Sequence, residues 1–176
     1  MADLFITTKE DFEIWHGNEH KGKFVFNKTI EHPKKTVRIG QSLFMDVELK
    51  GQMDLVTPVC YDKSCQNSSL LVYSNGEWHN LRVSFGDDNG IMWGFALKEG
   101  SKYMDTITLH SGDFNMDGYP DLLATLSPNN PEHPQSFFLE NVPCLTGCGK
   151  FKRSFAIKWG ALSSFKNGTA MAAFFD

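Results

Sequence analysis

Closely spaced oxygen-bearing side chains in the second half of the sequence form a pattern typical of a metal-binding loop. Counted from Asp113, acidic or amide side chains stand at loop positions one, three, five and nine, and a glycine stands at position six. Calcium takes six to eight oxygen ligands on a tightly turned backbone. A bound dication would also offset the repulsion between the carboxylates. We therefore predict a calcium site whose ligands are the side chains of Asp113, Asn115, Asp117 and Asp121 and the main-chain oxygen of Tyr119.

The same residues allow two other interpretations of this loop. An EF-hand closes with a bidentate Glu at position twelve and continues into a helix. Position twelve is Ala124, and Pro120 precedes an apolar segment, 121–126, that favours a strand. The EF-hand is therefore disfavoured. An ordinary solvated turn rich in Asp, Asn and Gly remains an alternative.

A second loop, residues 46–54, repeats this pattern with one change. Acidic residues stand at positions one, three and nine and a glycine at position six, but Lys50 occupies position five. The ammonium group of Lys50 could donate hydrogen bonds to Asp46, Glu48 and Asp54 where a metal would otherwise lie. We predict a metal-free copy of the calcium loop. A freely solvated Lys50 in an ordinary turn is the alternative.

The two loops belong to a longer repeat. The spacing from Asp46 to Asp113 equals, to within one residue, the spacing from Trp93 to Trp159, and each Trp lies in an alternating apolar segment followed by glycine. Equivalent positions in a repeat favour a core role for both Trp side chains. The ends of the chain fall inside the same pattern, at Asp3 and Asp176, so we expect a segment of a longer repeat array.

Apolar alternation and turn signals predict several short strands in each repeat. Asn75-Gly76 between two apolar runs is a strong hairpin signal. Four strands per repeat at this period is typical of propeller blades. We predict an all-β chain of about two to three incomplete four-stranded blades: a partial blade over 1–45, a blade with the degenerate loop over 46–112 and a blade with the calcium loop over 113–176. The strands are expected at 37–40, 54–59, 70–73, 78–81, 91–94, 122–126, 136–139 and 155–157.

The cysteines and the glycosylation sequons favour a secretory origin. The four cysteines form two close pairs, Cys60 with Cys65 and Cys144 with Cys148, and an even count suits local disulfides. Free thiols and a metal site are the alternatives, although the close spacing of a zinc knuckle is absent. Three acceptor sequons, which predict N-glycosylation, start at Asn27, Asn67 and Asn167.

Charge and motifs argue against several function classes. The chain has a formal net charge of -4 and a pI near 5.8, which is unlike a nucleic-acid binder. No secretory signal and no membrane span is visible in the sequence. It also lacks a GxSxG elbow, a P-loop and an HExxH motif, so we expect no enzymatic activity.

The calcium loop and its surroundings resemble known families. Residues 112–122 resemble the calcium-binding loop of FG-GAP repeats, which form the blades of integrin alpha-subunit propellers. Together with 137–144 and 172–176, the stretch 110–122 resembles the T-cell immunomodulatory protein family. The resemblance implies a propeller on the extracellular face of the plasma membrane, in a type I membrane glycoprotein that modulates T-cell function. It also implies calcium at the loop positions named above.

The main functional hypothesis is a non-catalytic extracellular recognition module. Its expected partners are a cell-surface or extracellular protein and the remaining blades of a parent propeller. A propeller enzyme or lectin is one alternative, and a truncated fragment of the parent protein is another. Substrate and glycan panels separate the first alternative from the main hypothesis, and the parent sequence separates the second.

Overall fold

The protein consists of β-strands joined by turns and loops. The computed structural model describes residues 3–18, 22–97, 107–128, 134–160 and 162, and none of them lies in a helix. No helix within those ranges is therefore available to cross a membrane. The prediction of an all-β chain is confirmed, and the antiparallel sheets are consistent with incomplete propeller blades. The chain divides into two compact units, Met1–Lys35 and Thr36–Asp176.

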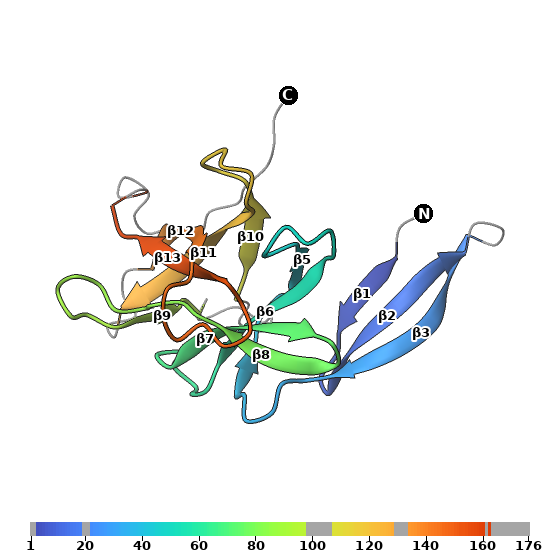
Figure 1. Ribbon diagram of the computed structural model, residues 1–176. Helices are drawn as coiled ribbons and strands as arrows, with labels where there is room; N and C mark the ends of the chain where they lie inside the picture. Colours follow the sequence, from blue (N-terminus) through green and yellow to red (C-terminus); the bar gives the residue numbers. More distant parts are fainter. Residues whose placement is uncertain (1–2, 19–21, 98–106, 129–133, 161, 163–176) are drawn as a thin grey trace. The chain divides into compact units, whose positions relative to one another are not determined.

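The first unit is a three-stranded antiparallel sheet. Its strands, in the order β1-β2-β3, are β1 (Leu4–Thr7), β2 (Asp11–Asn18) and β3 (Lys23–Glu31) (Figure 1). Phe12 is fully buried and packs against Phe5 and His32, with ring centroids 5.3 and 4.5 Å away. Phe12 and the rings around it therefore form a small aromatic core for this sheet.

The second unit begins with a five-stranded sheet whose first edge is split. The order is β4-β6-β7-β8, and β5 also pairs with β6. β4 joins one end of β6 through Arg38 and Ile39, while β5 joins the other end at Asp54 to Val56. The strands are β4 (Arg38–Ile39), β5 (Leu43–Met45), β6 (Asp54–Cys60), β7 (Ser68–Ser74) and β8 (Glu77–Leu81).

A second five-stranded sheet in this unit repeats the same plan. The order is β10-β11-β12-β13, and β9 pairs with the far end of β11, so the first edge is again split. In both sheets the acidic loop joins the short strand before it to the long strand after it. The strands are β9 (Trp93–Phe95), β10 (Leu109–Gly112), β11 (Asp121–Pro128), β12 (Gln135–Pro143) and β13 (Arg153–Lys158).

The two five-stranded sheets share one hydrophobic core. Their buried side chains form a single cluster, and the backbone N–H of Phe155 donates to the oxygen of Arg82 at 3.0 Å. Trp93 is buried and Trp159 is partly buried against the same cluster, so the predicted core role of both is confirmed. The two rings lie 5.6 Å apart and both contact Phe137, so they form one aromatic cluster. The predicted repeat boundaries at 46 and 113 stay predictions.

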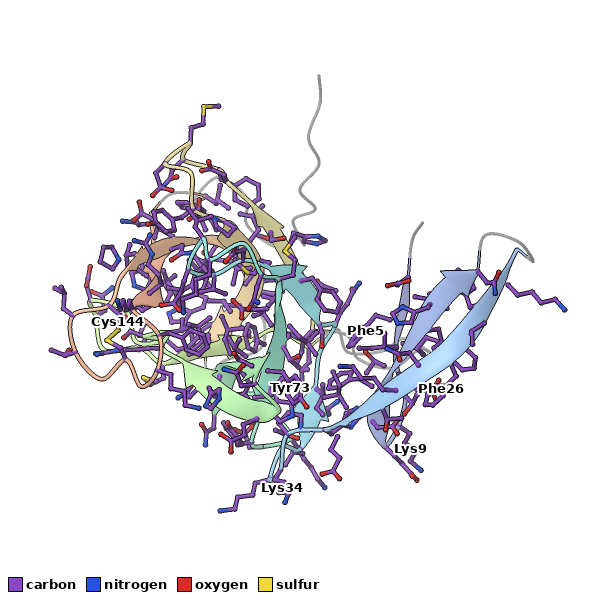
Figure 2. All side chains as sticks on the ribbon, turned by 45° about the vertical axis from the view of Figure 1, so that its right-hand side comes forward. Phe5, Lys9, Phe26, Lys34, Tyr73 and Cys144 are labelled. Carbon is purple, nitrogen blue, oxygen red and sulfur yellow. A yellow bond between two sulfur atoms is a disulfide. The ribbon has the colours of Figure 1, made fainter. Side chains whose placement is uncertain are left out.

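Two local predictions are confirmed in this unit. Asn75 and Gly76 form the turn between β7 and β8 with φ values of 54° and 85°, as a type I′ hairpin requires. All four cysteines are paired locally, Cys60 with Cys65 and Cys144 with Cys148. Figure 2 places Cys144 on the connection between β12 and β13. The disulfides therefore close two surface loops.

Candidate metal loop

The Asp113 loop is held by its own acidic side chains. The two carboxylate oxygens of Asp113 accept the backbone N–H groups of Asp117 at 3.0 Å and Gly118 at 2.9 Å. Positive φ values at Met116 (61°) and Gly118 (89°) turn the chain tightly enough for these contacts. Asp121 closes the loop by accepting the N–H of Phe114 at 3.1 Å. The sequence of this segment thus encodes a closed turn whose side-chain oxygens point inward.

The remaining predicted ligands also take part in this hydrogen bonding. Oδ1 of Asn115 accepts the N–H of Asp117 at 3.0 Å, and its amide nitrogen donates to Glu140 at 3.1 Å. Asp117 accepts the N–H of Tyr119 at 2.8 Å. Glu140 thus holds the Asn115 amide with its oxygen towards the loop. The structure therefore brings all five predicted ligand residues into one turn.

Asp121 is the most buried acid of the loop, and its environment disfavours the negative charge. Its side chain is fully buried and accepts the N–H of Asn141 at 2.8 Å in addition to that of Phe114. Burial raises the pKa of Asp121, and the nearby charge of Asp117 raises it further against the opposing hydrogen bonds. A cation beside these two carboxylates would relieve both effects.

The donor set suits calcium in chemistry, because every predicted ligand atom is an oxygen. Within the described ranges, however, no three His, Cys, Asp or Glu side chains come close enough together to hold a metal ion. Asp113 and Asp121 instead direct their oxygens at backbone N–H groups. Each carboxylate oxygen keeps a second lone pair. Small side-chain rotations would be needed to bring the oxygens onto one ion.

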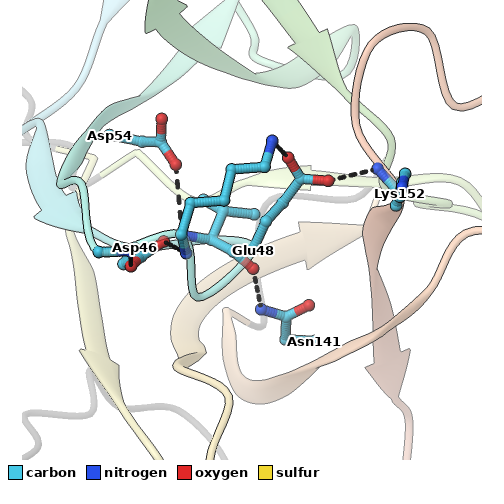
Figure 3. Close-up of polar contacts among 8 residues, drawn as sticks. Asp46, Glu48, Asp54, Asn141 and Lys152 are labelled. Atoms are coloured by element: carbon cyan, nitrogen blue, oxygen red, sulfur yellow. Dashed lines mark hydrogen bonds and ion pairs between the residues drawn. The ribbon is translucent and has the colours of Figure 1, made fainter.

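The Asp46 loop repeats the hydrogen bonds that the first and last acids make in the Asp113 loop. Asp46 accepts the N–H groups of Lys50 at 2.9 Å and Gly51 at 2.6 Å, and Asp54 accepts that of Val47 at 3.3 Å (Figure 3). Leu49 and Gly51 carry the positive φ values that Met116 and Gly118 carry in the other loop. The two segments are therefore structural copies, as their shared residue pattern predicts.

Lys50 makes one of its three predicted side-chain contacts. Its ammonium group forms an ion pair with Glu48 (Figure 3), and Asp46 is reached by the Lys50 backbone N–H instead. The hydrogen bond that Lys50 donates to Glu48 raises the pKa of Lys50, and the charges of Glu48, Asp54 and Asp46 add to this. The carboxylate of Glu48 also accepts the N–H of Lys152 at 2.6 Å. The loop thus carries an internal cation paired with an acid that also contacts the loop between β12 and β13.

Sequence reasoning missed the residue that connects the two loops. Asn141 is 1% exposed, and its amide nitrogen donates to the main-chain oxygens of Val47 at 3.0 Å and Pro120 at 3.1 Å. Arg153 donates to both oxygens of Asn141 and stacks on the Tyr119 ring, with its guanidinium carbon 3.6 Å from the centroid. No local pattern marks Asn141, because its partners come from distant parts of the chain.

The predicted glycosylation sites differ in setting. Asn27 is exposed on β3 where the β2–β3 register shifts, between Phe26 opposite Trp15 and Lys28 opposite Ile14. Asn67 is exposed beside the Cys60–Cys65 loop. Asn167 lies outside the described residues, as does Asp176. Exposure is necessary for glycosylation, and modification of all three sites stays a prediction.

Comparison with known proteins shows the family of the chain. It is 39% identical to mouse, 36% to human and 37% to rat T-cell immunomodulatory protein, in each case over 99% of this chain and 30% of the relative. Protein linkin of Caenorhabditis elegans is 20% identical over 85% of the chain. No family model and no solved structure matches. The chain thus spans about 30% of the length of these curated relatives, and over nearly its whole sequence it belongs to the T-cell immunomodulatory protein family.

Proposed function

We propose that this chain is a non-catalytic recognition module that acts outside the cell and modulates T cells through a protein partner. The observation that carries the proposal is the 39% identity to a protein named for T-cell immunomodulation. Two local disulfides and two exposed sequon asparagines support an oxidising, secretory setting. By its resemblance to the family, the parent is a type I membrane glycoprotein whose other blades contact this chain.

The proposed module includes one calcium ion in the Asp113 loop. Side-chain oxygens of Asp113, Asn115, Asp117 and Asp121 and the main-chain oxygen of Tyr119 would hold it. When bound, calcium supplies positive charge that offsets the repulsion between the loop carboxylates. Support comes from the all-oxygen donor set and from the buried charge of Asp121, whose pKa is raised by burial and by Asp117. The chain's own part is to fix the loop through Asn141 and Glu140.

Calcium binding is tested by thermal unfolding and calorimetry of the full chain. A ligand bound only by the folded form raises the free energy of unfolding by about 2.7 kcal/mol at a hundredfold excess over Kd. We expect this increase in the wild type and its loss in Asp117→Ala. Asp88→Ala, which removes an exposed carboxylate outside the loop, is the matched control and should keep the increase. An unchanged melting temperature in the wild type would rule out the site.

Recognition is tested on T cells with the chain secreted from mammalian cells behind an added signal sequence. We expect saturable binding of the labelled chain that unlabelled chain competes away, and a change in cytokine release. Asp117→Ala should weaken both effects if calcium shapes the recognition surface. Binding that never saturates, or unchanged cytokine release, would contradict the proposed function. If cytokine release falls while calcium binding stays normal, recognition of T cells and calcium binding are separate properties of the chain.

A further inference from the structure

A cavity lies between the end of β8 and the loop that joins β12 to β13. It has a volume of about 570 Å³ and is lined by His79, Asn80, Arg82, Gly147, Gly149 and Lys150. This volume lies within the range of about 300–1,000 Å³ that small-molecule sites occupy. Neither the acidic loops nor the calcium proposal uses any of these residues.

The lining is rich in hydrogen-bond donors and carries positive charge. Arg82 and Lys150 are cations, and among the described residues no carboxylate lines the cavity. The oxygen of the Asn80 amide accepts the hydroxyl of Ser69 at 2.7 Å, which leaves the amide nitrogen as a donor. This positive setting contrasts with a chain whose formal net charge is -4. The lining therefore favours an anion over a cation or an apolar ligand.

Arg82 is held in place by the loop across the cavity. Its Nη1 atom donates to the main-chain oxygen of Thr146 and, at 3.0 Å, to the Thr146 hydroxyl. A Cβ atom added to Gly147 would lie 3.1 Å from the same nitrogen, so glycine permits this close approach. In the described part of the chain the hydrogen bonds of the guanidinium use Nη1, so the Nε and Nη2 donors are available to a ligand. A planar fork fixed in this way suits two oxygens of one ligand group.

Lys150 supplies the second positive charge from the same loop. Its ammonium group is 3.2 Å from Nε2 of His79 and 3.5 Å from a carboxylate oxygen of Glu77. The side chain of Glu77 is 71% exposed, so water screens its charge strongly. The ammonium group has three donors and keeps at least one for a ligand. Arg82 and Lys150 thus flank the cavity as two separate cations.

The Cys144–Cys148 disulfide shapes the wall that carries this chemistry. It closes the segment containing Thr146 and Gly147, and the N–H of Cys144 donates to the oxygen of Lys152 at 2.8 Å across the base of the loop. Gly147 and Gly149 both have positive φ values, 68° and 58°, and they expose backbone at the cavity. Bare backbone and a fixed guanidinium are features of sites for tetrahedral anions.

We propose that this cavity, termed here the Arg82 site, binds a sulfate or phosphate group carried by a small molecule or a glycan. Arg82 would bind two of its oxygens and Lys150 a third, with the Asn80 amide as a further donor. The cavity leaves room for the group to which the anion is attached. The site does not depend on calcium.

The test is calorimetric titration of the full chain at constant ionic strength in EDTA. The probes are inorganic sulfate, inorganic phosphate, N-acetylglucosamine 6-sulfate and glucose 6-phosphate. We expect saturable binding of at least one ester at one site per chain. Binding of the sulfate ester alone indicates a sulfated glycan as the source, and binding of the phosphate ester indicates a phosphorylated ligand. Absence of saturable binding with all four probes would overturn the proposal.

Three variants locate the binding. Arg82→Gln and Lys150→Gln should each weaken binding by about tenfold or more, as expected for loss of a charge-assisted hydrogen bond. Lys28→Gln removes an exposed lysine from β3 and should leave the affinity unchanged. Lys150 is 62% exposed, so its variant stays folded even if Arg82→Gln disturbs the loop. Equal weakening in all three variants would mean general charge attraction and would overturn the proposal.

The disulfide provides an independent check. Cys144→Ser combined with Cys148→Ser should weaken anion binding and leave calcium binding intact, because only the wall of the Arg82 site is released. Unchanged anion affinity in this double variant would show that the loop does not build the site.

Discussion

The side-chain amide of Asn141 donates to the main-chain oxygen of Val47 at 3.0 Å, across 94 residues of sequence. This hydrogen bond joins the two copies of the acidic loop, because Asn141 also holds Pro120 and Asp121. A buried polar group with every partner in place contributes little net free energy, but removing one partner is costly. Asn141 is therefore a point at which the two five-stranded sheets depend on each other.

Replacing Asn141 should destabilise the fold strongly. Asn141→Leu keeps the branching at Cγ but leaves the oxygens of Val47 and Pro120 without their donor, and we expect a loss of about 3 kcal/mol in the free energy of unfolding. Urea denaturation of the wild type and variant measures this difference. Asn89→Leu, at an exposed turn position, serves as the control and should change stability by less than about 0.5 kcal/mol. A similar small change in Asn141→Leu would contradict the role given to this residue.

Acidification should weaken the contact made by Glu48. Burial alone would raise the pKa of Glu48, but the hydrogen bonds from Lys50 and the N–H of Lys152 lower it below its ordinary value of 4.5. A lowered pKa in the folded state means that the stabilisation is complete above the unfolded value and is lost as the pH falls through the folded value.

The measurement for Glu48 is the stability difference between wild type and Glu48→Gln as a function of pH. At pH 7 we expect the wild type to be more stable by about 1 kcal/mol. The difference should shrink as the pH is lowered from neutral to below 4.5 and the carboxylate is protonated. A difference that stays constant over that range would show that the Glu48 charge has no part in stability.

Lys50→Asp should convert the Asp46 loop into a second calcium site. The backbone of this loop already matches that of the Asp113 loop in its hydrogen bonds and positive φ values. The substitution restores the acid at position five and removes the competing ammonium group. Calorimetry should then show two calcium-binding events in place of one. An isotherm with an unchanged number of sites would contradict the idea that Lys50 replaces the metal.

The two Trp-Gly pairs of the repeat should respond differently to substitution. A Cβ on Gly94 would lie 1.8 Å from the main-chain oxygen of Cys65, whereas a Cβ on Gly160 would have no neighbour within 4 Å among the described residues. Gly94→Ala should therefore cost about 3 kcal/mol or more, because backbone atoms of the Cys60–Cys65 loop must move. Gly160→Ala is the matched control and should change stability by less than about 0.5 kcal/mol. Thermal unfolding of both variants checks this contrast.

Sequence patterns predicted the features that depend on neighbouring residues. The Asn75-Gly76 hairpin, the strands after each acidic loop and the local disulfides all follow from short-range turn geometry, β-propensity and cysteine spacing. The repeat also pointed to two similar loops. These features need no knowledge of how the sheets pack.

Contacts between distant segments could not be predicted in the same way. The pairing of Glu48 with the Lys152 backbone, the stacking of Arg153 on Tyr119 and the split first edge of each sheet depend on the packing of the sheets. The Arg82 site likewise combines β8 with a loop far along the chain. No periodicity in a single sequence records such contacts. Even within one loop the prediction was incomplete. The ammonium group of Lys50 pairs with Glu48 rather than with Asp46 or Asp54.

The hydrogen bonds of Asn141 also have a consequence for the unfolding of the second unit. The buried side-chain amide of Asn141 donates to turns of both sheets. Neither sheet can therefore open while the other keeps all of its backbone N–H groups protected from exchange. Hydrogen exchange should then report a single cooperative opening for β6 and β11, and the Asn141→Leu variant should split it into two.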